Sequence, residues 1–225
     1  MLQFSRAYLV TTNKEVFDQI AESWYRVRHW PLLREELEEL AQKWQGGRLL
    51  NIGCGHGADF LTFRQRFELW GVDFSPKMLK QAQRYATKFS FRVNLVMADM
   101  LTLPFSADSF DWVIAVAVYH HIKGKNDRES GFVELTRILK PGGEAFLTVW
   151  NRGQPRFWLK SKEQEIPWRL RGKTVYRYYH LFSYKETREL LTRAGLEILS
   201  MMPEKSYRLP IKSFSRNICA LVKKS

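Results

Sequence analysis

The sequence predicts an α/β protein built on a mostly parallel sheet. Strand-like and helix-like segments alternate from residue 48 to residue 150, the pattern of strands joined by crossover helices. Three glycines, Gly53, Gly55 and Gly57, stand between the first predicted strand and the next helix. The run Phe110–Val118 is almost entirely apolar, as expected of a strand buried on both faces. The length of 225 residues fits one domain with a sizeable core.

The helices and strands are predicted in chain order from three signals: the hydrophobic periodicity, the residues that cap helices and the residues that end them. Two helices, Lys14–Trp24 and Leu32–Trp44, are separated by Pro31, because proline cannot continue a helix. The first strand is Arg48–Ile52, and a helix over Ala58–Phe67 follows the glycines.

The second predicted strand, Glu68–Val72, ends at Asp73. Ser75 suits an N-cap and Pro76 the first helical position, so a helix is expected over Lys77–Thr87. The third to fifth strands and the helix before the fifth complete this region: Phe91–Met97, Phe110–Val118, the helix Asp127–Leu139 stopped by residues 140–143, and Glu144–Trp150.

The pattern changes after the fifth strand. Residues 151–181 show no clear period, and an irregular stretch of that length is expected to be functional. A helix over Tyr184–Ala194 and two closing strands, Leu196–Pro203 and Asn217–Val222, complete the chain. The predicted single domain therefore has four parts: N-terminal helices (1–47), a ligand-binding core (48–150), a basic and aromatic substrate segment (151–182), and a closing helix with strands (183–225).

The positive charge is concentrated in the last third of the chain. Lys and Arg number 36 against 23 Asp and Glu, a net charge of +13, of which +11 falls on residues 152–225. Such a segment favours a polyanion partner, although a solvated face remains the alternative. The predicted phosphate-binding cations are interleaved with aromatic residues that can stack on unpaired bases: Arg152, Arg156, Lys160, Arg169, Arg171 and Lys173.

Several protein classes are excluded by composition. No apolar run approaches the roughly 18 residues of a membrane span, and Met1–Val10 lacks the pattern of a secretory signal. Two cysteines, Cys54 and Cys219, form neither a disulfide framework nor a zinc site by themselves. We therefore expect a cytoplasmic protein without membrane contact or a bound metal.

The glycine loop is the first chemical signal. Glycine there allows a sharp turn and the close approach of a ligand. Asp73, 20 residues after Gly53, can accept hydrogen bonds from a ribose, and Asp99 can accept from an adenine amine. The glycines and Asp73 alone do not separate a dinucleotide-binding dehydrogenase from other adenosine binders, or from a tight turn without a ligand.

Five ordered motifs narrow the choice: L-L-N-I-G-C-G-H-G, G-V-D-F-S, A-D-M, L-P-F-S-A-D-S-F-D-W-V-I and L-K-P-G-G. Over residues 48–150 the chain resembles class I S-adenosylmethionine-dependent methyltransferases. The resemblance implies a Rossmann-like fold, with a mostly parallel seven-stranded sheet, helices on both faces and a C-terminal antiparallel strand. Asn51 departs from the family, which has Asp or Glu there, so this position brings no negative charge toward the sulfonium of the cofactor.

The same resemblance implies a set of cofactor-binding residues. The glycines would back the methionine part, Asp73 would hold the ribose and Asp99 the adenine amine. Phe74 and Met100 would flank the adenine, unless they pack in the core. The full predicted set is Asn51, Gly53, Gly55, Gly57, Asp73, Phe74, Ser75, Met78, Asp99, Met100 and Ala117.

Four further segments, two of them inside the core and two outside it, narrow the family further. F-D-Q-I-A-E-S-W-Y-R-V-R-H-W-P, A-V-A-V-Y-H-H, L-T-V-W and V-Y-R-Y-Y-H-L-F look like the tRNA wobble-uridine carboxymethyl methyltransferases. That resemblance implies methylation of a carboxylate on a wobble uridine, with the tRNA anticodon loop and a small zinc-binding activator subunit as partners. The residues it implies for positioning the modified base are Arg28, His121, Arg177, Tyr178 and His180.

The chemistry agrees with such a substrate. A carboxylate, with pKa near 4, is already ionised at neutral pH and needs cationic positioning groups rather than a base. Three alternatives stay open. Trp24, Trp30 and the histidines can be packing residues, the substrate can be a small metabolite such as a quinone precursor, or the chain can be a non-catalytic RNA-binding subunit.

Overall fold

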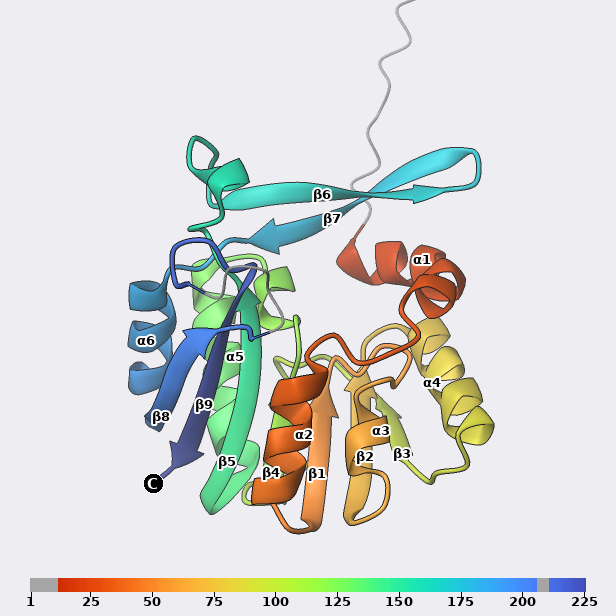
Figure 1. Cartoon of the computed structure of the whole chain (residues 1–225), viewed down its shortest axis with the longest axis vertical. Coiled ribbons are helices and arrows are strands. Elements are labelled where there is room, and N and C mark those ends of the chain that lie inside the picture. The colour runs from red at the N-terminus through yellow and green to blue at the C-terminus, as the bar shows by residue number, and fades with distance from the viewer. Residues whose placement is uncertain (1–11, 206–210) are drawn as a thin grey trace, which may run out of the picture.

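The computed structural model describes residues 12–205 and 211–225 of the chain, so Met1–Val10 and Arg208 lie outside the described residues. Figure 1 shows a twisted sheet flanked by helices, with a two-stranded hairpin lying across its upper edge. The seven strands of the sheet are β1 (Gly47–Ile52), β2 (Phe67–Asp73), β3 (Asn94–Met97), β4 (Phe110–Ala115), β5 (Leu139–Trp150), β8 (Leu196–Pro203) and β9 (Asn217–Lys224).

The strand order is β3-β2-β1-β4-β5-β9-β8. The pairs from β3 to β5 are parallel, whereas β9 runs antiparallel to both β5 and β8. The predicted mostly parallel seven-stranded sheet with an antiparallel strand near the C-terminus is therefore confirmed. The two closing strands form the expected hairpin pair.

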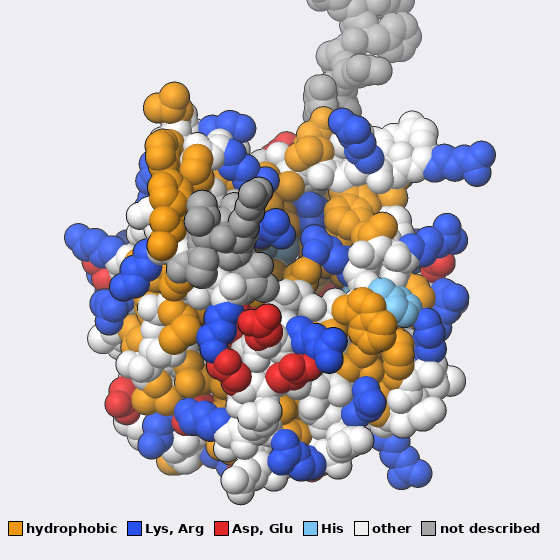
Figure 2. Space-filling model, viewed as in Figure 1, with side chains coloured by type: hydrophobic (Ala, Val, Ile, Leu, Met, Phe, Trp, Pro, Cys, Tyr) orange, Lys and Arg blue, Asp and Glu red, His pale blue; other side chains and the backbone are white. Residues whose placement is uncertain are grey.

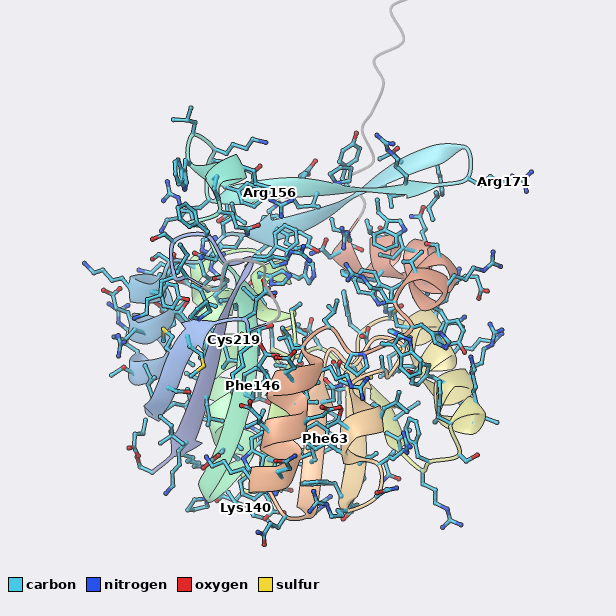
Figure 3. The ribbon with its side chains drawn as sticks, viewed as in Figure 1. Phe63, Lys140, Phe146, Arg156, Arg171 and Cys219 are labelled. Carbon is cyan, nitrogen blue, oxygen red and sulfur yellow. The ribbon has the colours of Figure 1, made fainter. Side chains whose placement is uncertain are left out.

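Helices cover both faces of the sheet, which gives it two apolar layers. The helices are α1 (Asn13–Val27), α2 (Arg34–Lys43), α3 (Phe60–Phe63), α4 (Pro76–Lys88), α5 (Lys125–Ile138) and α6 (Tyr184–Arg193). On one face, Phe132 of α5 and Leu191 of α6 pack in the larger core cluster. On the other, Leu37 of α2 and Phe63 of α3 pack with Phe146 of β5, and Figure 3 labels the last two.

The caps of α4 follow the sequence prediction. Ser75 is the N-cap, its Oγ accepts from the Met78 N–H at 3.1 Å, and Pro76 begins the helix. The prediction of a helix over Ala58–Phe67 is wrong in extent, because α3 spans only Phe60–Phe63. The chain enters α3 through short-range bonds such as Phe60 N–H to Gly57 O, and Phe67 already pairs with β1.

The fourth and fifth strands also differ from the predicted bounds. β4 ends at Ala115, because Ala117 adopts a left-handed φ of 59° and the chain turns into the short 3-10 helix Tyr119–His121. β5 begins at Leu139 instead of Glu144, so the residues 140–143 predicted to stop the helix lie inside the strand. A register shift between Phe110 and Trp112 in the β4–β5 pairing accommodates them.

The predicted irregular stretch 151–181 is wrong, because it contains an antiparallel hairpin. After a short 3-10 helix (Pro155–Phe157), β6 (Glu163–Leu170) pairs with β7 (Lys173–His180) along its whole length. Hydropathy hides the strand period here, because both faces of the hairpin carry aromatic and charged side chains. The hairpin rests on α1, where Trp168 Nε1 donates to Ser23 Oγ at 2.8 Å.

No helix in residues 12–205 and 211–225 is both long and apolar enough to cross a membrane.

Candidate active site

Two adjoining cavities lie at the carboxyl ends of the parallel strands. The larger has a volume of about 380 Å³ and the smaller about 190 Å³. Residues that line both mark where they join: Gly53, Asp73, Phe74, Met100 and His121. Figure 2 shows the molecule hollowed below the hairpin, with Lys and Arg side chains inside the hollow. Ligands of open α/β sheets bind at this edge.

The glycine loop forms one wall. Gly53 follows β1 with a φ of 63°, and a Cβ there would lie 2.6 Å from the methyl groups of Val118. Only glycine fits this position without a shift of the neighbouring turn. Gly55 also lines the larger cavity, whereas Gly57 lies outside both and packs toward Phe60.

Asp73, at the end of β2, sits at the junction of the cavities. Its two carboxylate oxygens accept from the backbone N–H groups of Gly55 and Ser75, both at 2.9 Å. Burial raises the pKa of Asp73 to about 6, while those two hydrogen bonds partly oppose the shift. The carboxylate is thus fixed in place and keeps lone pairs for the hydroxyl groups of a ligand.

The smaller cavity carries features suited to a planar ring. Asp99, after β3, lines it, and the Leu101 N–H donates to the Asp99 Oδ1 at 3.0 Å. Phe74 and Met100 line both cavities, so neither is only a core residue. The ring of Phe74 is held by Phe17 of α1, with 5.8 Å between centroids.

The far side of the larger cavity is basic. Its lining includes four arginines from four separate segments: Arg28, Arg156, Arg177 and Arg216. Arg177, only 6% exposed, lies over the rings of Trp168 at 5.0 Å and Tyr179 at 5.2 Å, measured from the guanidinium carbon to the centroid. Burial lowers the pKa of Arg28 and of Arg177 from the ordinary value of an arginine, yet both guanidinium groups stay protonated at neutral pH.

Three of these arginines have no acidic partner in the part of the chain that the structure describes. Among the described residues, no ion pair joins Arg28, Arg177 or Arg216 to a carboxylate. The Arg177 Nε is buried without a hydrogen-bond acceptor. Arg177 is buried, whereas Arg28 is half-buried and Arg216 is exposed. A buried positive charge without a counter-ion is costly, so the cavity around Arg177 is suited to an anionic ligand group.

His121 stands at the junction and is neutral. Its Nδ1 lies 2.9 Å from the Tyr178 carbonyl oxygen, which only accepts, so Nδ1 carries the proton and Nε2 is left as an acceptor. Burial, helped by the charge of Arg177, lowers the pKa of His121 to about 3. A group with that pKa is a poor proton acceptor at neutral pH.

Comparison with known proteins agrees with this site. The model of the methyltransferase domain family matches residues 49–143. A methyltransferase-family protein of Encephalitozoon cuniculi is 34% identical over 181 residues, covering 77% of this chain and 80% of its own. The chain is a class I S-adenosylmethionine-dependent methyltransferase.

Other known proteins resemble this chain in sequence over most of its length or in fold. The tRNA (carboxymethyluridine(34)-5-O)-methyltransferase of Schizosaccharomyces pombe is 28% identical, covering 82% of this chain and 88% of its own. An S-adenosylmethionine-dependent methyltransferase of Clostridium acetobutylicum superposes with a TM-score of 0.74 at 15% identity, covering 93% of this chain and 99% of its own. A Haloferax volcanii structure, a complex of the Trm112 methyltransferase activator with a methyltransferase, gives 0.69 at 19% identity, with 94% and 97% covered.

The residues present fit S-adenosylmethionine. Asp73 offers acceptors for ribose hydroxyls, and the smaller cavity offers Asp99 beside Phe74 and Met100 for an adenine. Gly53 and Gly55 leave room for the methionine part, and Met78 and Ala117 also line the larger cavity. Three residues predicted to bind the cofactor do not line either cavity: Asn51, Gly57 and Ser75.

The residues predicted to position the substrate fall into two groups. Arg28, His121 and Arg177 line the larger cavity of the methyltransferase together. Tyr178 and His180 do not. Because side chains alternate along a strand, Arg177 and Tyr179 point into the cavity from β7, whereas Tyr178 and His180 point away.

His180 is held outside the site by two carboxylates. Its Nδ1 lies 2.7 Å from Glu163 Oε1 of β6 and its Nε2 lies 2.7 Å from Glu186 Oε1 of α6. With both nitrogens engaged and the side chain only 2% exposed, it fastens the hairpin to α6 and does not reach a substrate in the larger cavity. We predicted that His180 and Arg177 act together on the substrate. In the structure Arg177 lines the cavity, whereas His180 lies outside it.

The predicted phosphate-binding cations are also divided. Arg156 lines the cavity and lies over the rings of Trp150 and Phe157 at 4.8 and 4.5 Å. Arg169, Arg171 and Lys173 are exposed on the hairpin, and Figure 3 shows Arg171 at its free end. Arg152 and Lys160 lie before the hairpin, the first half-buried and the second exposed.

The cavity residues absent from the predicted site include Asp59, Tyr179, Glu204 and Arg216. Tyr179 could have been found from strand alternation, had the hairpin been predicted. A carboxylate oxygen of Glu204 accepts a hydrogen bond from the Arg216 backbone N–H at 3.0 Å. These two residues are twelve positions apart, so no local sequence pattern predicts the contact.

Proposed function

We propose that this methyltransferase methylates the carboxylate of a 5-carboxymethyl-type uridine at the wobble position of tRNA. One observation carries the proposal: Arg28, Arg177 and Arg216 line the side of the cavity away from the glycine loop, and among the described residues none of them forms an ion pair with a carboxylate. A planar guanidinium can hold a carboxylate through two parallel hydrogen bonds.

The state of His121 supports the same acceptor. A hydroxyl or an ammonium must lose a proton before it accepts a methyl group, and that step needs a base. The pKa of His121 is lowered to about 3, first by burial, which makes it unsuited to this task. A carboxylate acceptor is already ionised at neutral pH and needs only to be aligned.

The proposed role of each residue follows from its position in the cavity or on the hairpin. When bound, S-adenosylmethionine supplies a methyl group activated by its sulfonium. Arg28 and Arg177 would hold the acceptor carboxylate, Tyr179 and Trp24 would flank the modified base, and His121 Nε2 would accept one hydrogen bond from it. Arg171 and Lys173 on the hairpin would contact phosphates of the anticodon loop.

The relatives favour tRNA over a small metabolite. The S. pombe relative is named as a tRNA carboxymethyluridine methyltransferase and aligns over most of both chains. The Haloferax structure is titled as a complex with the Trm112 activator. We therefore also propose that this enzyme works in the cytoplasm as a heterodimer with a small zinc-binding activator.

The test is methyl transfer from labelled S-adenosylmethionine to total tRNA, with and without a candidate activator. We expect label in tRNA, located in one wobble nucleoside and released by mild alkali, because esters are alkali-labile. An unmodified transcript of the same tRNA is the matched control, since it lacks the carboxyl group and should accept no label. Alkali-stable label, or equal labelling of the transcript, would contradict the proposed acceptor.

A further inference from the structure

Position 51, where the resemblance to class I methyltransferases leads us to expect an acid, is filled by an amide. Asn51 lies on β1, is 1% exposed and lines neither cavity. Eight residues later, after the glycine loop, Asp59 does line the larger cavity. The chain thus has no acid at position 51 of β1, but it has an acid, Asp59, in the larger cavity after the glycine loop.

The carboxylate of Asp59 has no structural partner of opposite charge. It occupies the N-cap position of α3 but makes no side-chain capping bond. Within residues 12–205 and 211–225, none of the ion pairs involves it. Burial raises the pKa of Asp59 to about 7, and only the amide of Asn51 favours its ionised form. An acid in such surroundings is suited to a ligand group that brings positive charge.

Of the five acids that line the joined cavities, three come from the turns after neighbouring parallel strands; the other two are Asp127 and Glu204. Asp59 lines only the larger cavity, Asp73 lines both, and Asp99 lines only the smaller. The cofactor offers hydrogen-bond donors in a matching order, which are the ammonium of its amino acid part, the ribose hydroxyls and the adenine amine. We propose that Asp59 holds the ammonium group of the methionine part, in place of an acid at position 51. This assignment is independent of which acceptor is methylated.

Binding of two ligands separates this role from a general loss of the site. S-adenosylhomocysteine and 5′-methylthioadenosine share the adenosine and the sulfur, but only the first carries the amino acid. In Asp59→Asn we expect the Kd for S-adenosylhomocysteine to rise about tenfold or more, the effect of losing a charged hydrogen bond. The Kd for 5′-methylthioadenosine should stay within about twofold. Both values are measured by titration calorimetry, after a thermal melt shows that the variant is folded.

Two further variants make the outcome decisive. Asp73→Asn is the matched control, because it should weaken both ligands. The double variant Asp59→Asn/Asp73→Asn should weaken S-adenosylhomocysteine more than Asp73→Asn alone, but 5′-methylthioadenosine by the same factor as Asp73→Asn. An unchanged ratio of the two Kd values in Asp59→Asn overturns the proposal.

Discussion

The two ends of the ligand cavity carry opposite charges. The cofactor end has Asp59, Asp73 and Asp99 in the turns that follow β1, β2 and β3, and its smaller cavity is also lined by Asp127 and one cation, Lys123. The opposite end has four arginines, from the C-cap of α1, the segment before the hairpin, β7 and the residue before β9, against one acid, Glu204. A cationic cofactor and an anionic acceptor would each meet the opposite charge, and this arrangement would bring the methyl donor and the acceptor face to face.

The two ends also differ in how they are built. The acids lie in short connections of one sheet edge, and their positions follow from the strand order. Arg28 and Arg177 are brought together by the packing of α1 and the hairpin over that edge (Figure 1), and Arg216 joins them through the pairing of β9 with β5. Changes at the cofactor end should alter cofactor affinity, whereas changes at the arginine end should alter transfer to the acceptor.

Arg177→Ala should give the largest difference between the two ends, because it should affect methyl transfer and leave cofactor binding unchanged. We expect methyl transfer to tRNA to fall roughly a hundredfold, because a misplaced acceptor costs about that factor, while the Kd for S-adenosylhomocysteine changes less than about twofold. Initial rates with saturating cofactor and calorimetric titration measure the two quantities.

The matched control for this variant is Arg92→Ala, since Arg92 is exposed before β3 and lines neither cavity. It should keep the transfer rate of the wild type. If Arg177→Ala turned over at the wild-type rate, Arg177 would have no part in holding the acceptor.

The cofactor end could be predicted from the sequence because its signals are local. Gly53, Asp73 and Asp99 each follow a predicted strand, and in a parallel sheet those strand ends meet at one edge. Asp59 escaped notice because it sits where α3 begins, and no nearby sequence pattern reports that its side chain faces the cavity.

The arginine end could be predicted only in part. The sequence marked Arg28 and Arg177 but also Tyr178 and His180, because it did not predict β7 and so could not assign alternate residues to opposite faces. Arg216 reaches the cavity through the pairing of β9 with β5, a contact between residues far apart in the chain. Charge counts located the basic third but could not separate cavity cations from exposed ones such as Arg171.

A medium effect is expected from loosening the hairpin without touching the cavity. Burial alone would raise the pKa of Glu186, but hydrogen bonds from His180 and Lys162 outweigh it and lower the pKa to about 2. Because the folded-state pKa lies below the ordinary 4.5, Glu186 stabilises the fold above pH 4.5, and this contribution is lost as pH falls toward 2. Glu186→Gln should therefore lower Tm by a few degrees at neutral pH, and the difference from wild type should shrink below pH 4.5.

The control for this prediction is Glu189→Gln on the same helix, which is exposed and forms no ion pair among the described residues. It should show no such pH-dependent difference. Methyl transfer by Glu186→Gln should fall only a few-fold, because Arg177 stays in the cavity while β7 loses part of its anchoring. A Tm difference that persisted unchanged to pH 3 would argue against the carboxylate of Glu186 as the stabilising group.

The smallest effect is expected at the free end of the hairpin. Arg171 and Lys173 flank Gly172, which turns with a φ of 79°, and both cations are exposed. If they contact phosphates, Arg171→Ala/Lys173→Ala should weaken tRNA binding a few-fold and reduce the slope of log K against log salt by about one to two. Arg92→Ala/Lys140→Ala removes the same charge, and Figure 3 shows Lys140 at the end of the molecule opposite the hairpin, so this variant should keep the wild-type slope. Equal slopes for the two double variants would mean that the hairpin end acts only through net charge, and the phosphate contacts would then have to lie on the cations nearer the cavity.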